Sequence, residues 1–118
     1  NEITRKRYML PNGRWECYTC GKPIDEPKKA HTGHSINAHF CGLRLRYDLR
    51  NLRVQDHYCN INLGSNGATY LWKLISEIGM KEVGDMFELL KLRKTPLEDE
   101  RSFIENLITE YRLILSEL

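Results

Sequence analysis

The sequence predicts an α+β fold, with short strands and turns in its first half and helices in its second half. All four cysteines and all four histidines lie between residues 17 and 59. The second half has neither residue and instead carries apolar side chains at helical spacing. With 118 residues the chain is large enough for one modest core and small enough to gain from a cross-link or a bound metal.

Short strands are expected in the first half of the chain. Residues 14–18 are aromatic and follow a Pro-Asn-Gly turn signal, which predicts a first strand. Residues 24–29 are polar, contain Pro27 and directly follow Pro23, so they are predicted to form a loop. Residues 30–36 are small or compatible with β structure and predict a strand that carries His31 and His34.

An alternating stretch follows this strand. In residues 43–47, leucine or tyrosine alternates with arginine, the two-residue period of a half-buried strand, so we expect a hairpin with residues 30–36. A turn at Asp48 or Asn51 should follow. Residues 59–64 predict a short helix ended by glycine, and the glycine-rich segment 64–67 predicts a flexible loop.

Three helices are expected in the second half. The first runs from residue 68 and ends at Gly79, and the second covers residues 83–90. The third begins at residues 95–98, which read Thr-Pro-Leu-Glu and combine a capping Thr, a first-turn Pro and a capping-box Glu. Its apolar stripe over residues 104–118 is expected to pack in the core.

These patterns suggest how the chain is organised. We expect residues 1–67 to hold the chemistry and residues 68–118 to form a helical extension that packs on them or mediates a homodimer. Both parts should belong to one compact domain.

Charge is distributed unevenly along the chain. Residues 1–59 carry 11 lysines and arginines against 6 acidic residues, a net charge of +5, whereas residues 60–118 carry 7 against 10, a net charge of −3. The basic half is also the half with cysteine and histidine, which points toward nucleic acid as a partner, although charge alone slightly favours an ordinary solvated basic face. No stretch reaches the roughly 20 apolar residues of a membrane span, so we expect a soluble protein without a membrane partner.

The pair Cys17-x-x-Cys20 is the strongest metal-binding signal. This spacing places two thiolates on one tight turn, and the following Gly21 lets the backbone reverse. Four cysteines could also form two disulfides. Because no export signal is visible, zinc in a reducing compartment is the favoured interpretation.

A closed zinc site needs two further ligands. Cys59 is the best third ligand, and a second turn of the same kind places its partner three residues earlier, at Asp56. His57 and then Cys41 are the alternatives for the fourth position, and Cys41 fits a small buried apolar residue better.

The ordered set of motifs resembles a known family. It is similar to the zinc-bearing HNH endonucleases of the ββα-metal class in their His-Asn-Asn form, and most similar to the phage NinG (Rap) recombination nucleases. The resemblance covers about residues 15–79 and implies a phage DNA endonuclease in the bacterial cytoplasm, with possible preference for branched DNA. The motifs that carry it are Cys17-x-x-Cys20, Gly33-His34, the Leu-Arg-Tyr-Asp-x-x-Asn run ending at Asn51, Cys59-Asn60, and the glycines of 64–67.

The resemblance assigns roles to three residues. His34 is implied as the general base that takes a proton from water. Asn60 is implied as an oxygen ligand of a catalytic Mg²⁺ or Mn²⁺. Asn51 is implied to hold a loop and orient His34 without touching the substrate.

The chain departs from the commonest HNH pattern at Gly33, because that pattern has a metal-binding acidic residue directly before the catalytic histidine. His31 is the candidate substitute ligand, and it would need a bend or bulge at Gly33 to face the same way as His34. Asp48 is a weaker candidate.

Four arginines are candidates for phosphate contacts that flank the cut, and each fits an ordinary surface charge as well. His39 is expected on the surface. Two other functions use the same residues: a non-catalytic zinc-binding adaptor for DNA or protein, and an RNA-directed nuclease. The arginines are Arg44, Arg46, Arg50 and Arg53.

Overall fold

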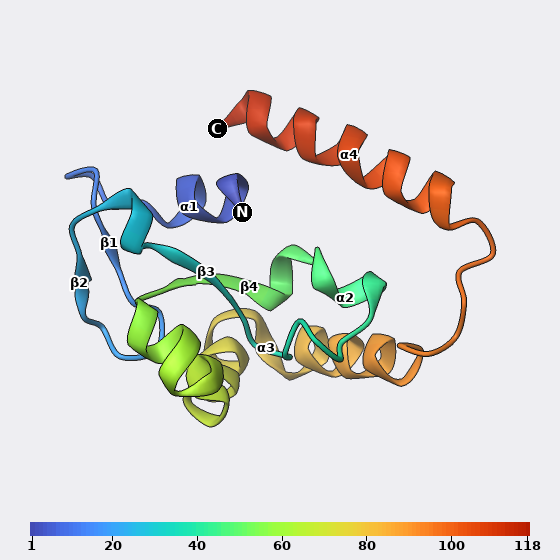
Figure 1. Cartoon of the computed structure of the whole chain (residues 1–118), viewed down its shortest axis with the longest axis horizontal. Coiled ribbons are helices and arrows are strands. Elements are labelled where there is room, and N and C mark those ends of the chain that lie inside the picture. The colour runs from blue at the N-terminus through green and yellow to red at the C-terminus, as the bar shows by residue number, and fades with distance from the viewer.

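The computed structural model describes residues 1–118 and contains two small antiparallel sheets surrounded by helices (Figure 1). No helix is both long and apolar enough to span a bilayer. The helices are α1 (Glu2–Tyr8), α2 (Leu43–Arg46), α3 (Gly67–Lys91) and α4 (Glu100–Glu117), with shorter helical turns η1 (Pro27–Lys29), η2 (Leu49–Asn51), η3 (Tyr58–Asn62) and η4 (Gly64–Asn66). The strands are β1 (Trp15–Glu16), β2 (Pro23–Ile24), β3 (His31–His34) and β4 (Leu52–Gln55).

The first sheet pairs β1 with β2. Trp15 lies opposite Ile24 and both are buried. The strand expected in residues 14–18 is therefore confirmed in shorter form, whereas Ile24 belongs to a strand instead of the predicted loop. The apolar pair explains the difference, because it buries both side chains on one face of the hairpin.

The second sheet pairs β3 with β4 in a regular register. His31 lies opposite Gln55 and Gly33 opposite Arg53, without an inserted residue. The strand predicted to carry His31 and His34 is confirmed. The bulge that would turn both histidines to one face is absent, so these two side chains lie on opposite faces.

The hairpin partner predicted at residues 43–47 is wrong. This segment forms the one-turn helix α2, and β4 takes its place beside β3. Gly42 precedes the turn with φ 82°, and only Leu45 of the alternating apolar residues is fully buried. A helical turn suits the segment because one leucine anchors it against α3 while its arginines stay near solvent.

The segment expected to be a flexible loop is a tight turn. Ser65 and Asn66 both have positive φ, and Ser65 is buried, so η4 connects η3 directly to α3. The helix predicted to end at Gly79 does change direction there, since Gly79 has φ 90°. The chain then resumes helical geometry, and both expected helices form the two parts of α3.

Helix α4 starts later than its sequence signal indicated. Asp99 caps it by accepting from the N–H of Ser102 at 3.0 Å, and the predicted cap at Thr95 is wrong. Figure 1 shows α4 crossing the molecule on the side of α1 and α2 away from α3. None of its residues is fully buried, so the expected place of its whole stripe in the core is also wrong.

Two apolar clusters form the core. One joins α2 and the preceding loop to α3, and the other joins both sheets to η3. The paired strands β3 and β4 lie between them and carry His31, His34 and Arg53. The first cluster comprises Ile36, Cys41, Leu45, Tyr70, Leu74, Val83 and Met86, and the second comprises Trp15, Cys17, Ile24, Ala30, Val54 and Cys59.

Candidate metal centre and active site

Four candidate ligands converge at one end of the molecule. The sulfur atoms of Cys17, Cys20 and Cys59 and a carboxylate oxygen of Asp56 all lie within 4.8 Å of one another. In a tetrahedral zinc site with Zn–S bonds of about 2.3 Å, neighbouring sulfur atoms are about 3.8 Å apart. The four groups therefore need only a small contraction to bind one ion.

The first two ligands lie on the turn between β1 and β2. Gly21, with φ 78°, donates its N–H to the carbonyl of Cys17 at 2.8 Å. The N–H of Cys17 in turn donates to the carbonyl of Lys22 at 2.8 Å. This tight turn brings the Cys17 and Cys20 thiols to the same side, as their spacing predicted.

The other two ligands lie where β4 ends and η3 begins. Asp56 acts as a cap, because its Oδ1 accepts from the N–H of Cys59 at 2.8 Å. Its Oδ2 accepts from the thiol of Cys20 at 3.1 Å. Asp56 thus fixes the helical turn and also links the two halves of the cluster.

The electrostatics of the cluster favour a cation. Burial raises the pKa of Cys20 to about 12, and its hydrogen bonds with Asp56, Cys17 and Cys59 raise it further although the N–H of Lys22 opposes this. Burial also opposes ionisation of Asp56, but the pKa of Asp56 is lowered because the N–H of Cys59 and the Cys20 thiol donate to it. A divalent ion would stabilise the negative charges that these groups otherwise hold at a cost.

The two alternative ligands lie outside this cluster. His57 is exposed, and the edge of its ring faces His31 with the ring centroids 5.2 Å apart. Cys41 is fully buried in the cluster of α2 and α3, where it packs as a small apolar residue. The structure therefore brings together the set that was ranked first from the sequence, and these four residues could bind a metal ion.

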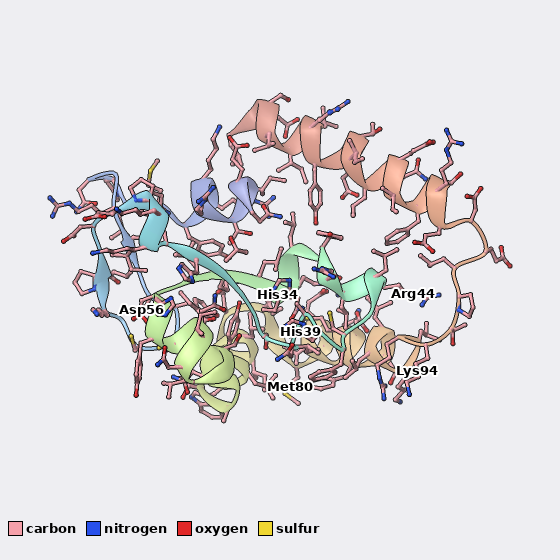
Figure 2. The ribbon with its side chains drawn as sticks, viewed as in Figure 1. His34, His39, Arg44, Asp56, Met80 and Lys94 are labelled. Atoms are coloured by element: carbon pink, nitrogen blue, oxygen red, sulfur yellow. The ribbon has the colours of Figure 1, made fainter.

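His34 lies away from the four-residue metal-binding cluster. Figure 2 shows His34 near the middle of the molecule and Asp56 toward the end formed by β1 and β2. The Nε2 of His34 is 2.9 Å from the carbonyl oxygen of Arg46. A carbonyl can only accept, so Nε2 carries the proton and Nδ1 of the neutral ring has a free lone pair. Burial lowers the pKa of His34, which the Arg46 carbonyl only partly opposes.

Asn51 holds the loop that orients His34. Its side chain is completely buried, and its Oδ1 accepts from the N–H of Ile36 at 2.7 Å. Its Nδ2 donates to the carbonyls of Ile36 at 3.1 Å and Leu45 at 3.2 Å. Leu45 precedes Arg46, so Asn51 fixes the segment whose carbonyl accepts from His34. These are the contacts of a loop-holding residue, and its part in catalysis stays a prediction.

His31 and Asn60 meet on the other face of the hairpin. The Nδ2 of Asn60 lies 3.1 Å from the Nδ1 of His31. The two residues predicted to share a cation are therefore neighbours. Asp48, the weaker candidate, is engaged elsewhere: it caps η2 and pairs with Arg50 at 2.7 Å.

Among the four arginines proposed as phosphate contacts, Arg53 is corrected by the structure. It is 3% exposed and pairs with Glu77 at 3.0 Å, and its guanidinium lies over the rings of Tyr8 and Tyr18. It therefore holds α1, β4 and α3 together and cannot reach DNA. Tyr8 of α1 and Glu77 of α3 cover the face of β4 on which Arg53 lies.

The other three arginines differ in how many groups of the protein they bind. Arg50 pairs with Asp48 and Glu82. Arg44 donates to the carbonyls of Leu92 and Thr95 at 2.7 and 3.0 Å. Arg46 forms no ion pair, and its guanidinium lies 5.9 Å from the centre of the Tyr47 ring.

One polar residue of this region was missed from the sequence. Gln55 at the end of β4 is completely buried. It was missed because an uncharged residue beside Asp56 belongs to no recognisable metal-binding or catalytic motif. The signal that points to it is indirect: a glycine at position 33 leaves room for a side chain from the neighbouring strand.

The sequence matches one family of known proteins. The family model described as Bacteriophage Lambda NinG protein matches residues 1–118. No curated protein and no solved structure gives a match. Since the match covers the whole chain, including the cysteine cluster and the β3–β4 hairpin, this chain belongs to the bacteriophage lambda NinG family, which is associated with phage recombination.

Proposed function

We propose that this protein is a metal-dependent DNA endonuclease of the HNH type that acts in phage recombination or DNA processing. The observation that carries the proposal is the state of His34. Its ring is neutral, fixed by the Arg46 carbonyl, and leaves Nδ1 free, which is the arrangement a general base requires.

His34 would take a proton at Nδ1 from the water that attacks the phosphorus atom. The Nε2–H···O hydrogen bond to Arg46 fixes the ring direction and stabilises the imidazolium that forms, because the donor becomes charged while the carbonyl stays in place. Asn51 acts through this carbonyl and is a positioning residue.

His31 and Asn60 are the residues that would hold the catalytic Mg²⁺ or Mn²⁺. They are 3.1 Å apart and both are partly exposed, so a cation can reach them from solvent. Rotation of the Asn60 amide presents its oxygen in place of its nitrogen. When bound, the cation would stabilise charge on the scissile phosphate and on the leaving oxygen. Because His34 lies on the opposite face of β3, this role requires the phosphate to lie at an edge of the β3–β4 pair, where groups from both faces can reach it.

The four-ligand cluster is proposed as a structural zinc site. Three thiolates favour zinc over hard cations, and the carboxylate of Asp56 completes the set. Metal analysis of protein purified without added zinc should find about one equivalent per chain. Metal-free protein of unchanged thermal stability would refute this assignment.

A plasmid assay tests the nuclease. Supercoiled DNA with Mg²⁺ or Mn²⁺ should be nicked or linearised by the wild type and left intact by His34→Ala. His39→Ala is the matched control, because His39 is exposed and should be dispensable. Equal cleavage by the wild type and His34→Ala would refute the role of the histidine as base.

An adaptor that binds zinc and DNA without cleaving is the alternative, and the missing carboxylate at Gly33 favours it. It predicts DNA binding without cleavage at any cation concentration. A preference for branched DNA is tested separately with a four-way junction and a linear duplex of the same composition. Equal cleavage of both substrates would leave a general endonuclease.

A further inference from the structure

Gln55 carries a buried oxygen without a partner. The side chain is 0% exposed, and its Nε2 donates to Thr19 Oγ1 at 3.0 Å and to the carbonyl of Ser65 at 2.8 Å. Because a carbonyl only accepts, the nitrogen must face Ser65, which fixes the orientation of the amide. The Oε1 atom then points the other way, where no hydrogen-bond donor reaches it.

The unpartnered oxygen fills the place of a missing side chain. A β-carbon added to Gly33 would overlap Oε1 of Gln55. Residue 33 is the position at which the commonest HNH pattern has its metal-binding carboxylate. Here the opposite strand supplies an oxygen at the β-carbon position of residue 33.

The side chain of Gln55 lies on the same face of the strand pair as His31, one of the proposed cation ligands. Gln55 lies directly opposite His31 in the β3–β4 ladder, so the two side chains share a face. His31 in turn contacts Asn60. A buried acceptor without a partner is destabilising, and a cation beside it would supply the missing partner.

We propose that Oε1 of Gln55 is a further ligand of the divalent cation and replaces the carboxylate that Gly33 lacks. This inference rests on the proposed nuclease function. It gives a ligand set of one imidazole and two amide oxygens, without a formal negative charge. Such a set should bind Mn²⁺ more tightly than Mg²⁺. Imidazole is a good ligand for transition metals, whereas the absence of a negatively charged ligand lowers the affinity for the hard cation Mg²⁺.

The test measures binding of Mn²⁺ to zinc-loaded protein without DNA, from the electron paramagnetic resonance signal of the free ion. The wild type should bind one Mn²⁺. Gln55→Met, which keeps the size of the side chain but removes the oxygen, should weaken binding about tenfold or more. Gln55→Glu keeps an oxygen and should bind at least as tightly as the wild type.

This pair separates a ligand from a structural residue. Both variants lose the NH₂ group that bonds to Thr19 and Ser65, so a structural role predicts equal weakening in both, which would overturn the inference. Wild-type affinity in Gln55→Met would overturn it too. Gly33→Asp combined with Gln55→Ala should restore binding, because the carboxylate enters the vacated space.

A measurement on the wild type covers the case in which Gln55→Met loses its zinc and fold. Substoichiometric Mn²⁺ should broaden the side-chain NH₂ signals of Gln55 and Asn60 before the indole signal of the exposed Trp72. Uniform broadening would overturn the inference. Failure of the wild type to bind Mn²⁺ or cleave DNA would instead refute the proposed function itself.

Discussion

Replacement of Asn51 by alanine is the sharpest test of how the loop that orients His34 is held. The side chain makes three buried hydrogen bonds, one from the N–H of Ile36 and two to the carbonyls of Ile36 and Leu45. Alanine leaves the N–H and the carbonyl of Ile36 unpaired at about 1 to 1.5 kcal/mol each, whereas the Leu45 carbonyl still accepts from the N–H of Asp48 at 3.2 Å, so we expect a loss of about 2 to 3 kcal/mol. That is a large part of the 5 to 15 kcal/mol by which a domain is usually stable.

The assay is urea unfolding of zinc-loaded protein followed by tryptophan fluorescence. Trp15 is 6% exposed and reports the loss of the core, whereas Trp72 is 71% exposed and changes little. Asn37→Ala is the matched control, since Asn37 lies in the same loop but is exposed and accepts one hydrogen bond. A loss below about 1 kcal/mol in Asn51→Ala, or an equal loss in both variants, would refute the reasoning.

Three further predictions concern His34, the metal cluster and the buried arginine. Burial lowers the pKa of His34, so the unfolded chain takes up a proton at a higher pH than the folded protein does. The free energy of unfolding should therefore rise with pH up to about 6.5. This rise should be smaller in His34→Ala when urea midpoints are compared across pH. Asp56→Cys supplies a fourth thiolate and should hold zinc more tightly in competition with a chelator, and weaker retention would contradict the assigned cluster. Glu77→Gln leaves Arg53 buried without its counter-ion and should lower the free energy of unfolding by about 2 kcal/mol, less than for a fully buried pair because Glu77 is partly exposed; unchanged urea stability would contradict the pairing.

The parts of the fold that follow local rules could be predicted from the sequence. The strand with His31 and His34, the interruption at Gly79 and the cysteine turn all depend on residues close together in the chain. The segment 43–47 was mistaken for a strand because alternation over a few residues also fits one helical turn, and only packing against α3 decides between them.

In the candidate site, too, features set by residues close in sequence could be predicted, whereas features set by distant contacts could not. Cys17, Cys20, Asp56 and Cys59 could be grouped in advance because each pair lies three residues apart and a metal site joins the pairs. Arg53 could not be assigned, because its burial depends on α1 and α3, which are distant in sequence. Gln55 was missed since its meaning comes from the absent side chain of Gly33 on the opposite strand.

The cysteine cluster and the proposed cation ligands are physically linked, which gives a final prediction. Asp56 and Cys59 anchor the turn that begins directly after Gln55 and ends at Asn60, and the N–H of Asn60 donates to the carbonyl of Asp56 at 3.0 Å. Bound zinc would therefore fix both proposed amide ligands without touching them.

Cys20→Ser tests this link, because Cys20 lies on the β1–β2 turn and is remote in sequence from Asn60. Loss of zinc from this variant should weaken Mn²⁺ binding, measured by the same resonance signal, since the turn that presents Asn60 loses its anchor. Cys41→Ala is the control: its thiol lies in the other apolar cluster, so zinc and Mn²⁺ should both be retained. A zinc-free Cys20→Ser protein with wild-type Mn²⁺ affinity would show that the two places act independently.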